Sequence, residues 1–375
     1  MSNIPRLPEK WTSESMLLSL ENYLLAIEEH LPTALVSSTA LSNIRTIARE
    51  LPPVKVAGFE CSLEEIGADA DFLVCVDGAI DTLTGRNASV KLNDSVVTSP
   101  PWQRLLTFCQ ARSESAALQQ IKNIWLEFDT SRHSVPILRP SVFFGIHRPK
   151  NYQRVAEAGL RLLRGSALPA QLTHTLSLCF GALPTNTRVF QVGMMLSRQT
   201  TPVRLCVGGL ARDQLLGYLS DIGWSGSMDD LTDVLGALSH PLQALAVDLD
   251  VDGDVGPRLG IECYVGQEYS LVNVFPNWEL FLNQLVGLGL CLPSKRDALL
   301  AWPGYAFREA VLPSLFLRGI NHVKIVWEPP GLVYAKAYLS FVHAWRGSIT
   351  EMSRQTGEAS RRVSETHNPP LIDAS

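Results

Sequence analysis

The chain has 375 residues, of which 46% are hydrophobic and 18% are charged, and its formal net charge at pH 7 is −5. This apolar content is ample for a large core, and an acidic chain with scattered lysines and arginines lacks the basic surface typical of nucleic-acid binding. No run approaches the roughly 20 consecutive apolar residues that a membrane-spanning helix needs. We therefore predict a folded protein with neither a nucleic acid nor a membrane as partner.

The seven cysteines are spread widely along the chain and form no Cys-x-x-Cys pair. The first ten residues also lack the charged and then apolar pattern of a secretory signal. An odd number of cysteines without such a signal is typical of reduced thiols, so we expect a cytoplasmic protein. Neither the cysteines nor the histidines show metal-ligand spacing, and we predict no metal cofactor.

The first structural unit follows a flexible lead-in, which we expect over residues 1–12. Apolar residues at helical spacing from Met16 to Ile27 predict a helix, for which Thr12 or Ser13 can serve as the N-cap. A second, shorter helix ends before Pro52 and Pro53. Two strands are predicted next, over 58–63 and 71–77.

The same order of two helices and two strands recurs four more times before residue 345. In the second unit a helix is expected from Pro101. Helices are expected over 152–163 and 169–180 in the third unit, and over 213–222 and after Ser227 in the fourth. The fifth unit is predicted to have helices over 278–288 and 294–302. The strands expected after them are 124–129 and 142–147, 188–196 and 203–208, 244–250 and 259–265, and 323–328 and 334–342. The polar residues 346–375 are predicted to form a disordered tail.

The predicted strands alternate with a period of two, which separates their side chains onto two faces. Leu245, Val247 and Leu249 share one face, whereas the side chains between them share the other: Ala246, Asp248 and Asp250. One face is apolar and fits under helices, and the opposite face is polar and aromatic. An open antiparallel sheet with one face in water would also show this pattern. Because every repeat would bury the same face, we favour an α+β fold with one domain over 13–345. That fold is a ten-stranded antiparallel β-barrel of five ααββ repeats, surrounded by helices, with a polar chamber inside.

This layout resembles that of the ABBA-type aromatic prenyltransferases, whose prenyltransferase barrel has five such repeats. The resemblance covers roughly residues 14–345 and is carried by three short motifs. Glu60-Cys61-Ser62 looks like the Glu-x-Ser strand of the indole prenyltransferase branch, and Val247-Asp248-Leu249 is similar to the family's Phe-Asp-Leu strand. Lys336-Ala337-Tyr338 looks like one of its Lys-x-Tyr motifs.

The resemblance implies transfer of a prenyl group from a prenyl diphosphate to an aromatic or other nucleophilic acceptor, which is a small molecule or a peptide side chain. It implies that Glu60 orients the acceptor and that Tyr264 and Tyr338 shield the allyl cation. The diphosphate, a co-substrate rather than a cofactor, would be held by three cations: Arg204, Lys324 and Lys336. No metal is implied.

The chain departs from the family pattern in three places. Cys206 follows Arg204 where the family has a tyrosine, and Glu262 precedes Tyr264 where it has a lysine. The second repeat has Phe143 and Gly145 where a basic residue would lie. Two alternatives therefore stand beside prenyl transfer. One is a non-catalytic binding protein of the same fold that acts on a biosynthetic peptide or metabolite. The other is a different acid–base reaction in the same chamber, performed by three inward-facing carboxylates: Glu127, Asp248 and Glu262.

Overall fold

The computed structural model describes residues 19–76, 94–130, 138–146, 152–198, 202–238, 245–265, 278–308 and 314–345. The lead-in predicted over 1–12 and the tail predicted over 346–375 both lie outside these residues. So do Thr12 and Ser13, the caps predicted for the first helix.

Ten strands form a closed antiparallel barrel, as the sequence predicted. The strands are β1 (Val56–Ser62), β2 (Ala70–Cys75), β3 (Ile121–Phe128), β4 (Ser141–Ile146), β5 (Arg188–Met194), β6 (Val203–Leu210), β7 (Leu245–Val251), β8 (Val255–Cys263), β10 (Ser314–Glu328) and β11 (Leu332–Trp345). Neighbouring strands pair in this order, and β11 closes the ring by pairing with both β10 and β1. The alternative of an open sheet is therefore wrong.

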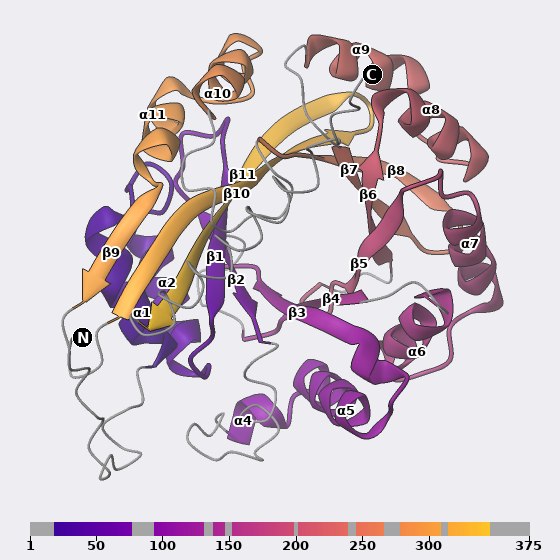
Figure 1. Ribbon diagram of the computed structural model, residues 1–375, viewed down its shortest axis with the longest axis horizontal. Coiled ribbons are helices and arrows are strands. Elements are labelled where there is room, and N and C mark those ends of the chain that lie inside the picture. The colour runs from indigo at the N-terminus through magenta and orange to yellow at the C-terminus, as the bar shows by residue number, and fades with distance from the viewer. Residues whose placement is uncertain are drawn as a thin grey trace, which may run out of the picture.

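Helices lie outside the ring of strands, and a pair of them precedes each pair of barrel strands (Figure 1). The pairs are α1 (Leu20–Ile27) with α2 (Ser38–Arg49), α4 (Asp94–Val97) with α5 (Pro100–Glu114), α6 (Tyr152–Arg164) with α7 (Ala170–Gly181), α8 (Arg212–Asp221) with α9 (Met228–Ala237), and α10 (Trp278–Gly287) with α11 (Pro293–Ala301). This confirms the fivefold ααββ repeat.

Local sequence signals explain where several helices begin. The Ser227 hydroxyl accepts a hydrogen bond from the Asp230 amide and caps α9, as its sequence position predicted. Ser37 caps α2 in the same way. Helix α5 carries proline in its first turn, where the missing amide hydrogen costs no intrahelical bond.

The two faces of the barrel wall differ as the alternation predicted. Every second side chain lies under the helices and is fully buried, as are Phe72, Leu126, Leu205, Leu249 and Ile261. The side chains between them, which include Glu60, Arg204, Asp248, Glu262 and Lys324, project into the barrel, and these five are also buried. The apolar core thus forms a shell between barrel and helices, and the polar groups occupy the interior.

Strand β10 is longer than predicted and contains an irregularity. Its pairing with β11 shifts between Ile320 and His322, so that Asn321 is an extra residue. The shift exchanges the two faces: Arg318, before it, donates to the carbonyl of Trp302 at the helical side, whereas Lys324, after it, points inward. A further strand that the sequence did not predict, β9 (Gly304–Arg308), pairs with the first residues of β10.

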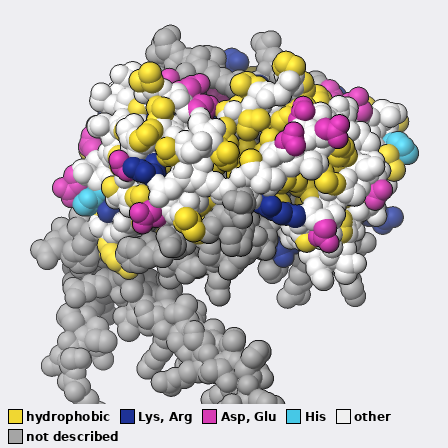
Figure 2. All heavy atoms as spheres, turned by 90° about the horizontal axis from the view of Figure 1, so that it is seen from above, with side chains coloured by type: hydrophobic (Ala, Val, Ile, Leu, Met, Phe, Trp, Pro, Cys, Tyr) yellow, Lys and Arg dark blue, Asp and Glu magenta, His cyan; other side chains and the backbone are white. Residues whose placement is uncertain are grey.

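The outer surface mixes side chains of all kinds. Figure 2 shows acidic, basic and hydrophobic side chains interspersed over the described atoms of one face. Within the described residues, no helix combines the length and the apolar character that crossing a membrane would require.

Candidate functional site

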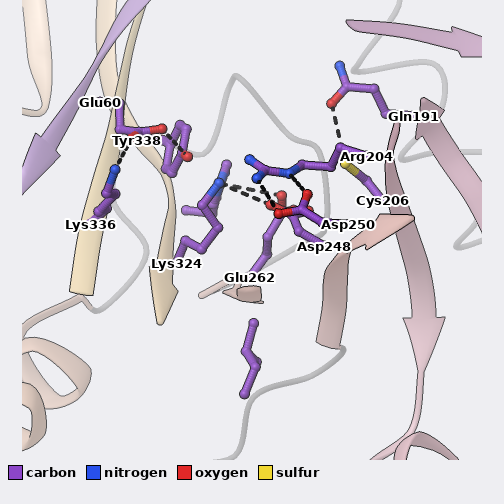
Figure 3. A network of polar contacts seen from close by, with 12 residues as sticks. Glu60, Gln191, Arg204, Cys206, Asp248, Asp250, Glu262, Lys324, Lys336 and Tyr338 are labelled. Carbon is purple, nitrogen blue, oxygen red and sulfur yellow. Dashed lines mark hydrogen bonds and ion pairs between the residues drawn. The ribbon is translucent and has the colours of Figure 1, made fainter. Parts of the chain in front are cut away.

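All nine residues singled out in the sequence lie on or at the end of barrel strands. Glu60 is on β1, Glu127 on β3, Arg204 on β6, Asp248 on β7, Glu262 on β8, Lys324 on β10, and Lys336 and Tyr338 on β11, while Tyr264 directly follows β8. Figure 3 shows that the side chains of Glu60, Arg204, Asp248, Glu262 and Lys324 point toward one another across the barrel interior. The strands therefore bring together groups that lie up to 278 residues apart in the chain.

The first group of contacts surrounds Glu60. Because Glu60 pairs with Tyr338 across β1 and β11, and Ser62 pairs with Lys336, the three polar side chains emerge side by side on the inner face. Lys336 Nζ donates to Glu60 Oε1, and the Tyr338 hydroxyl donates to Glu60 Oε2. The ammonium group of Lys324 lies 4.5 Å from the centroid of the Tyr338 ring. We call these four residues the Glu60 cluster.

The electrostatic environment keeps Glu60 ionised. Burial opposes ionisation, but the charges of Lys336 and Lys324 and the two hydrogen bonds outweigh it and hold the pKa of Glu60 well below its ordinary range. The same pairing raises the pKa of Lys336 against its own burial. Glu60 is thus a permanent hydrogen-bond acceptor rather than an acid.

The second group of contacts lies across the interior, on β6 and β7. Arg204 pairs directly with Asp250 in the sheet, and its Nε and Nη2 donate to the two carboxylate oxygens at 2.8 and 3.0 Å. Lys324 reaches from β10 to Asp248, with Nζ 3.0 Å from Oδ2. It crosses β8 at Gly260, where an added Cβ would lie 3.0 Å from Lys324 Cδ and 3.1 Å from Asp248 Cβ. Glycine at this position therefore gives the ion pair room to form.

A third group contains a carboxyl with the opposite pKa shift. The Tyr264 hydroxyl donates to Glu262 Oε2 at 2.5 Å. Burial and the charge of Asp248 raise the pKa of Glu262 to about 8, which Lys324 only partly offsets. The His322 ring stacks on Tyr338, with centroids 4.1 Å apart and planes inclined by 17°. Burial and the neighbouring Lys324 lower the pKa of His322 to about 3, so this imidazole is neutral at physiological pH.

Glu127 projects inward from β3 between the outward-facing Leu126 and Phe128. Burial and the charge of Glu60 raise its pKa to about 7, although Lys324, Arg198 and Arg204 pull the other way. The interior thus contains carboxyls held ionised at Glu60 and Asp248, and carboxyls held near neutrality at Glu127 and Glu262.

Sequence reasoning missed two members of this network. His322 was overlooked because the predicted strand began only at residue 323, although His322 shares the inner face with Lys324 two residues later. Asp250 shares the inner face with Asp248, and its role as the partner of Arg204 could have been found from the pairing of β6 with β7. Cys206 also faces inward, with Sγ 3.8 Å from Gln191 Oε1.

A separate cavity of about 590 Å³ lies between α6, α7 and β5. Its lining includes Tyr152, Glu157, Phe180 and Arg188. None of the nine residues singled out in the sequence contributes to it, so it is not part of the interior network.

Comparison with known proteins adds no family assignment. No protein-family model matches the chain, and a search of curated proteins finds no match either.

Proposed function

We propose that the chain transfers a prenyl group from a prenyl diphosphate to an aromatic or other nucleophilic acceptor inside the barrel. The observation that carries this proposal is the Glu60 cluster. It combines an ionised carboxylate, two ammonium groups and a tyrosine ring on the inner wall of a closed ααββ barrel. The proposal therefore places the chain beside the ABBA-type prenyltransferases.

The residues of the Glu60 cluster, together with Arg204 and Tyr264, have distinct tasks in this proposal. Glu60 accepts a hydrogen bond from the acceptor and so positions its nucleophilic atom. Arg204, Lys324 and Lys336 stabilise the negative charge that develops on the departing diphosphate. The rings of Tyr338 and Tyr264 face the allyl cation, and each such cation–π contact contributes roughly 0.5–2 kcal/mol.

The bond changes balance without a further reactant. The C–O bond between the prenyl carbon and the diphosphate breaks, and diphosphate leaves with the electron pair. An electron pair of the acceptor forms the new bond to the prenyl carbon. The acceptor then loses a proton to solvent, while Glu60 stays ionised as the hydrogen-bond partner that orients it.

Donor binding must compete with the ion pairs already present. Arg204, Lys324 and Lys336 are paired with Asp250, Asp248 and Glu60, respectively. A diphosphate that enters the interior gains charge-assisted hydrogen bonds only where it displaces or shares these carboxylates. Removing one competing carboxylate should therefore tighten donor binding, whereas removing one cation should weaken it.

A second candidate function is favoured by the divergent pKa values of the interior carboxyls. Glu60 and Asp248 are held ionised, while the pKa of Glu262 is raised to about 8 and that of Glu127 to about 7. Pairs of titratable groups pushed apart in this way are typical of general acid–base catalysis. Such a reaction would convert an acceptor-like substrate without any prenyl donor.

Calorimetric titration with the thiodiphosphates of dimethylallyl, geranyl and farnesyl alcohols separates the two candidates. Prenyl transfer requires saturable binding of at least one donor. Lys336→Met and Arg204→Met should each weaken that binding by about 10- to 100-fold, because each removes charge-assisted hydrogen bonds to phosphate oxygens. Asp250→Asn should tighten it, since Arg204 is then released from its carboxylate partner.

Arg49→Ala is the matched control, because Arg49 is an exposed cation on the outer helix α2. Affinity that falls in the interior variants and not in this control supports prenyl transfer. No binding of any donor to the folded wild-type protein would contradict it. In that case a substrate screen without donor would test the acid–base reaction, and binding without turnover would indicate a binding protein.

A further inference from the structure

Four potential metal ligands lie on four neighbouring strands of the barrel. They are Cys206 on β6, Asp248 on β7, Glu262 on β8 and His322 on β10. Cys206 pairs directly with Asp248, and Glu262 pairs directly with Lys324, two residues after His322. All four side chains project from the inner face. Figure 3 shows Asp248 and Glu262 near the centre of the polar network and Cys206 at its side, next to Gln191.

The spacing of their donor atoms is compatible with a shared ion. The Cys206 sulfur and one carboxylate oxygen each of Asp248 and Glu262 all lie within 4.8 Å of one another. His322 Nε2 is 3.8 Å from Glu262 Oε1. Tetrahedral zinc, with bonds of about 2.0–2.3 Å, separates its ligand atoms by roughly 3.3–3.8 Å. The donor atoms of Cys206, Asp248 and Glu262 are therefore close to the spacing that a tetrahedral ion requires, and His322 Nε2 lies beside one of them.

The hydrogen bonds leave the inward-facing atoms available. Asp248 uses Oδ2 for Lys324, and within the described part of the chain its Oδ1 is buried without a hydrogen-bond partner. Glu262 uses Oε2 for the Tyr264 hydroxyl, so Oε1 remains on the side of His322. One oxygen of each carboxylate therefore accepts the hydrogen bond that orients the group, and the other oxygen is available to a metal ion. In metal sites, the ligands are oriented by hydrogen bonds from surrounding residues in the same way.

His322 is the independent observation that points to a ligand. The residue is only 8% exposed, and among the described residues its Nε2 has no hydrogen-bond partner. Its Nδ1 lies 2.8 Å from Asn321 Oδ1. In the tautomer whose Nδ1–H donates to this amide oxygen, Nε2 carries a lone pair directed at Glu262. A backing hydrogen bond of this kind is typical of metal-binding histidines.

From this geometry we propose that Cys206, Asp248 and Glu262 form a zinc site on the inner wall, with His322 as the fourth ligand. The donor set of one sulfur, one imidazole nitrogen and two carboxylate oxygens suits a borderline-soft divalent ion better than magnesium or calcium. The charges also balance: a thiolate, two carboxylates, a divalent ion and the neighbouring Lys324 ammonium sum to zero. Cys206 and Glu262 are, in addition, two of the positions at which the chain departs from the cation-x-Tyr pattern.

This site contacts Lys324 and Tyr264, which also belong to the proposed prenyl-transfer machinery, so its test reads metal binding and not activity. The full chain is first treated with a chelator and then titrated with Zn²⁺ by calorimetry and with Co²⁺ by absorption spectroscopy. We expect one equivalent of metal per chain and a thiolate-to-Co²⁺ charge-transfer band. Cys206→Ser should abolish this band, and Glu262→Gln should lower the Zn²⁺ affinity by at least about tenfold. Tyr264→Phe, which removes only an outer-shell hydrogen bond, should lower it by about 10- to 100-fold.

Cys263→Ser is the matched control. Cys263 is adjacent to Glu262 but faces the outer side of the wall, where it is fully buried. Its variant should retain the band and the stoichiometry. Failure of the folded wild-type chain to bind one equivalent of Zn²⁺ would overturn the proposal, as would a charge-transfer band that persists in Cys206→Ser. Should Cys206→Ser not fold, undiminished Zn²⁺ affinity in Glu262→Gln would overturn it equally.

Discussion

The two faces of the barrel wall are built from the same strands but follow different rules. The outer face is mainly apolar: Phe72, Leu126 and Leu249 are each fully buried under the helical coat. The inner face, on the same strands, carries ion pairs such as Lys336–Glu60 and Lys324–Asp248. The outer face thus accounts for the fold, whereas the inner face requires another explanation.

Energetics sharpen this contrast. Burial of a large apolar side chain contributes roughly 1.5–3 kcal/mol to folding. A buried ion pair contributes little beyond a hydrophobic pair of the same shape, because desolvation of both charges offsets their attraction. Charges concentrated on the inner face are therefore better explained by a ligand than by stability. The predictions below test the two faces against each other.

The largest effect is expected on the outer face, from Phe72→Ala. The Phe72 ring is fully buried and lies 6.0 Å from that of Phe59. Its removal leaves a cavity in a closely packed shell and should lower the free energy of unfolding by about 3–5 kcal/mol. Urea denaturation measures this loss, and a loss below about 1 kcal/mol would show that the shell is not the main source of stability.

An inner-face pair should behave differently when both partners are replaced. Lys336→Met alone leaves Glu60 without its nearest cation. We expect a loss of roughly 1–3 kcal/mol, less than for a fully buried pair because the Lys336 side chain is 21% exposed. The double variant Glu60→Gln/Lys336→Met should return to within about 1 kcal/mol of the wild type.

The double-mutant cycle is measured by urea denaturation of the two single variants, the double variant and the wild type. Additive losses, with no recovery in the double variant, would mean that this ion pair stabilises the fold as the outer face does.

The inner face should also impose a pH dependence, to which Glu127 contributes. Its pKa is raised from 4.5 to about 7 by burial and by Glu60. An acid with a higher pKa in the folded than in the unfolded protein binds its proton more tightly when folded. The contribution of Glu127 to stability is therefore lost as the pH rises from about 4.5 to about 7, and it changes little above that range.

Urea midpoints at pH 5 and pH 8 measure this dependence. The decrease between the two values should be smaller in Glu127→Gln than in the wild type. Some decrease should remain, because the raised pKa of Glu262 acts in the same direction. An equal decrease in both proteins would show that Glu127 does not titrate in this range.

The smallest effect is expected for an ion pair on the coat. Arg49 on α2 contacts Glu21 on α1, and the Arg49 side chain is 58% exposed. Solvent screens such an exposed pair, so Arg49→Ala should change the thermal midpoint little. If Arg49→Ala lowered the free energy of unfolding as much as Lys336→Met does, the location of an ion pair, on the helical coat or on the inner face, would not determine its contribution to stability.

The outer face and the strand order could be predicted from the sequence, because a period of two and a repeated ααββ order depend only on local pattern. The inner contacts depend on register between strands that are distant in the chain. The extra residue Asn321 could not be foreseen, and His322, which directly follows it, lay outside the strand predicted over 323–328. Strand β9 was missed because only its pairing with the unpredicted start of β10 defines it.

Asp248 and Glu262 were identified from the sequence as inward-facing carboxylates, but the grouping of the four candidate zinc ligands was missed for the same reason. They come from four strands and share no local spacing, so only the pairing of β6, β7, β8 and β10 brings them together. By contrast, Glu60 and Lys336-x-Tyr338 could be identified early because each resembles a short motif. The structure then placed these residues in contact with one another.

The central claim is that the inner face binds a diphosphate donor, and a crystal structure with geranyl thiodiphosphate tests it most directly. The account predicts diphosphate density inside the barrel, within hydrogen-bonding distance of at least two of Arg204, Lys324 and Lys336. Diphosphate bound only outside the barrel, for example in the cavity between α6, α7 and β5, would contradict it.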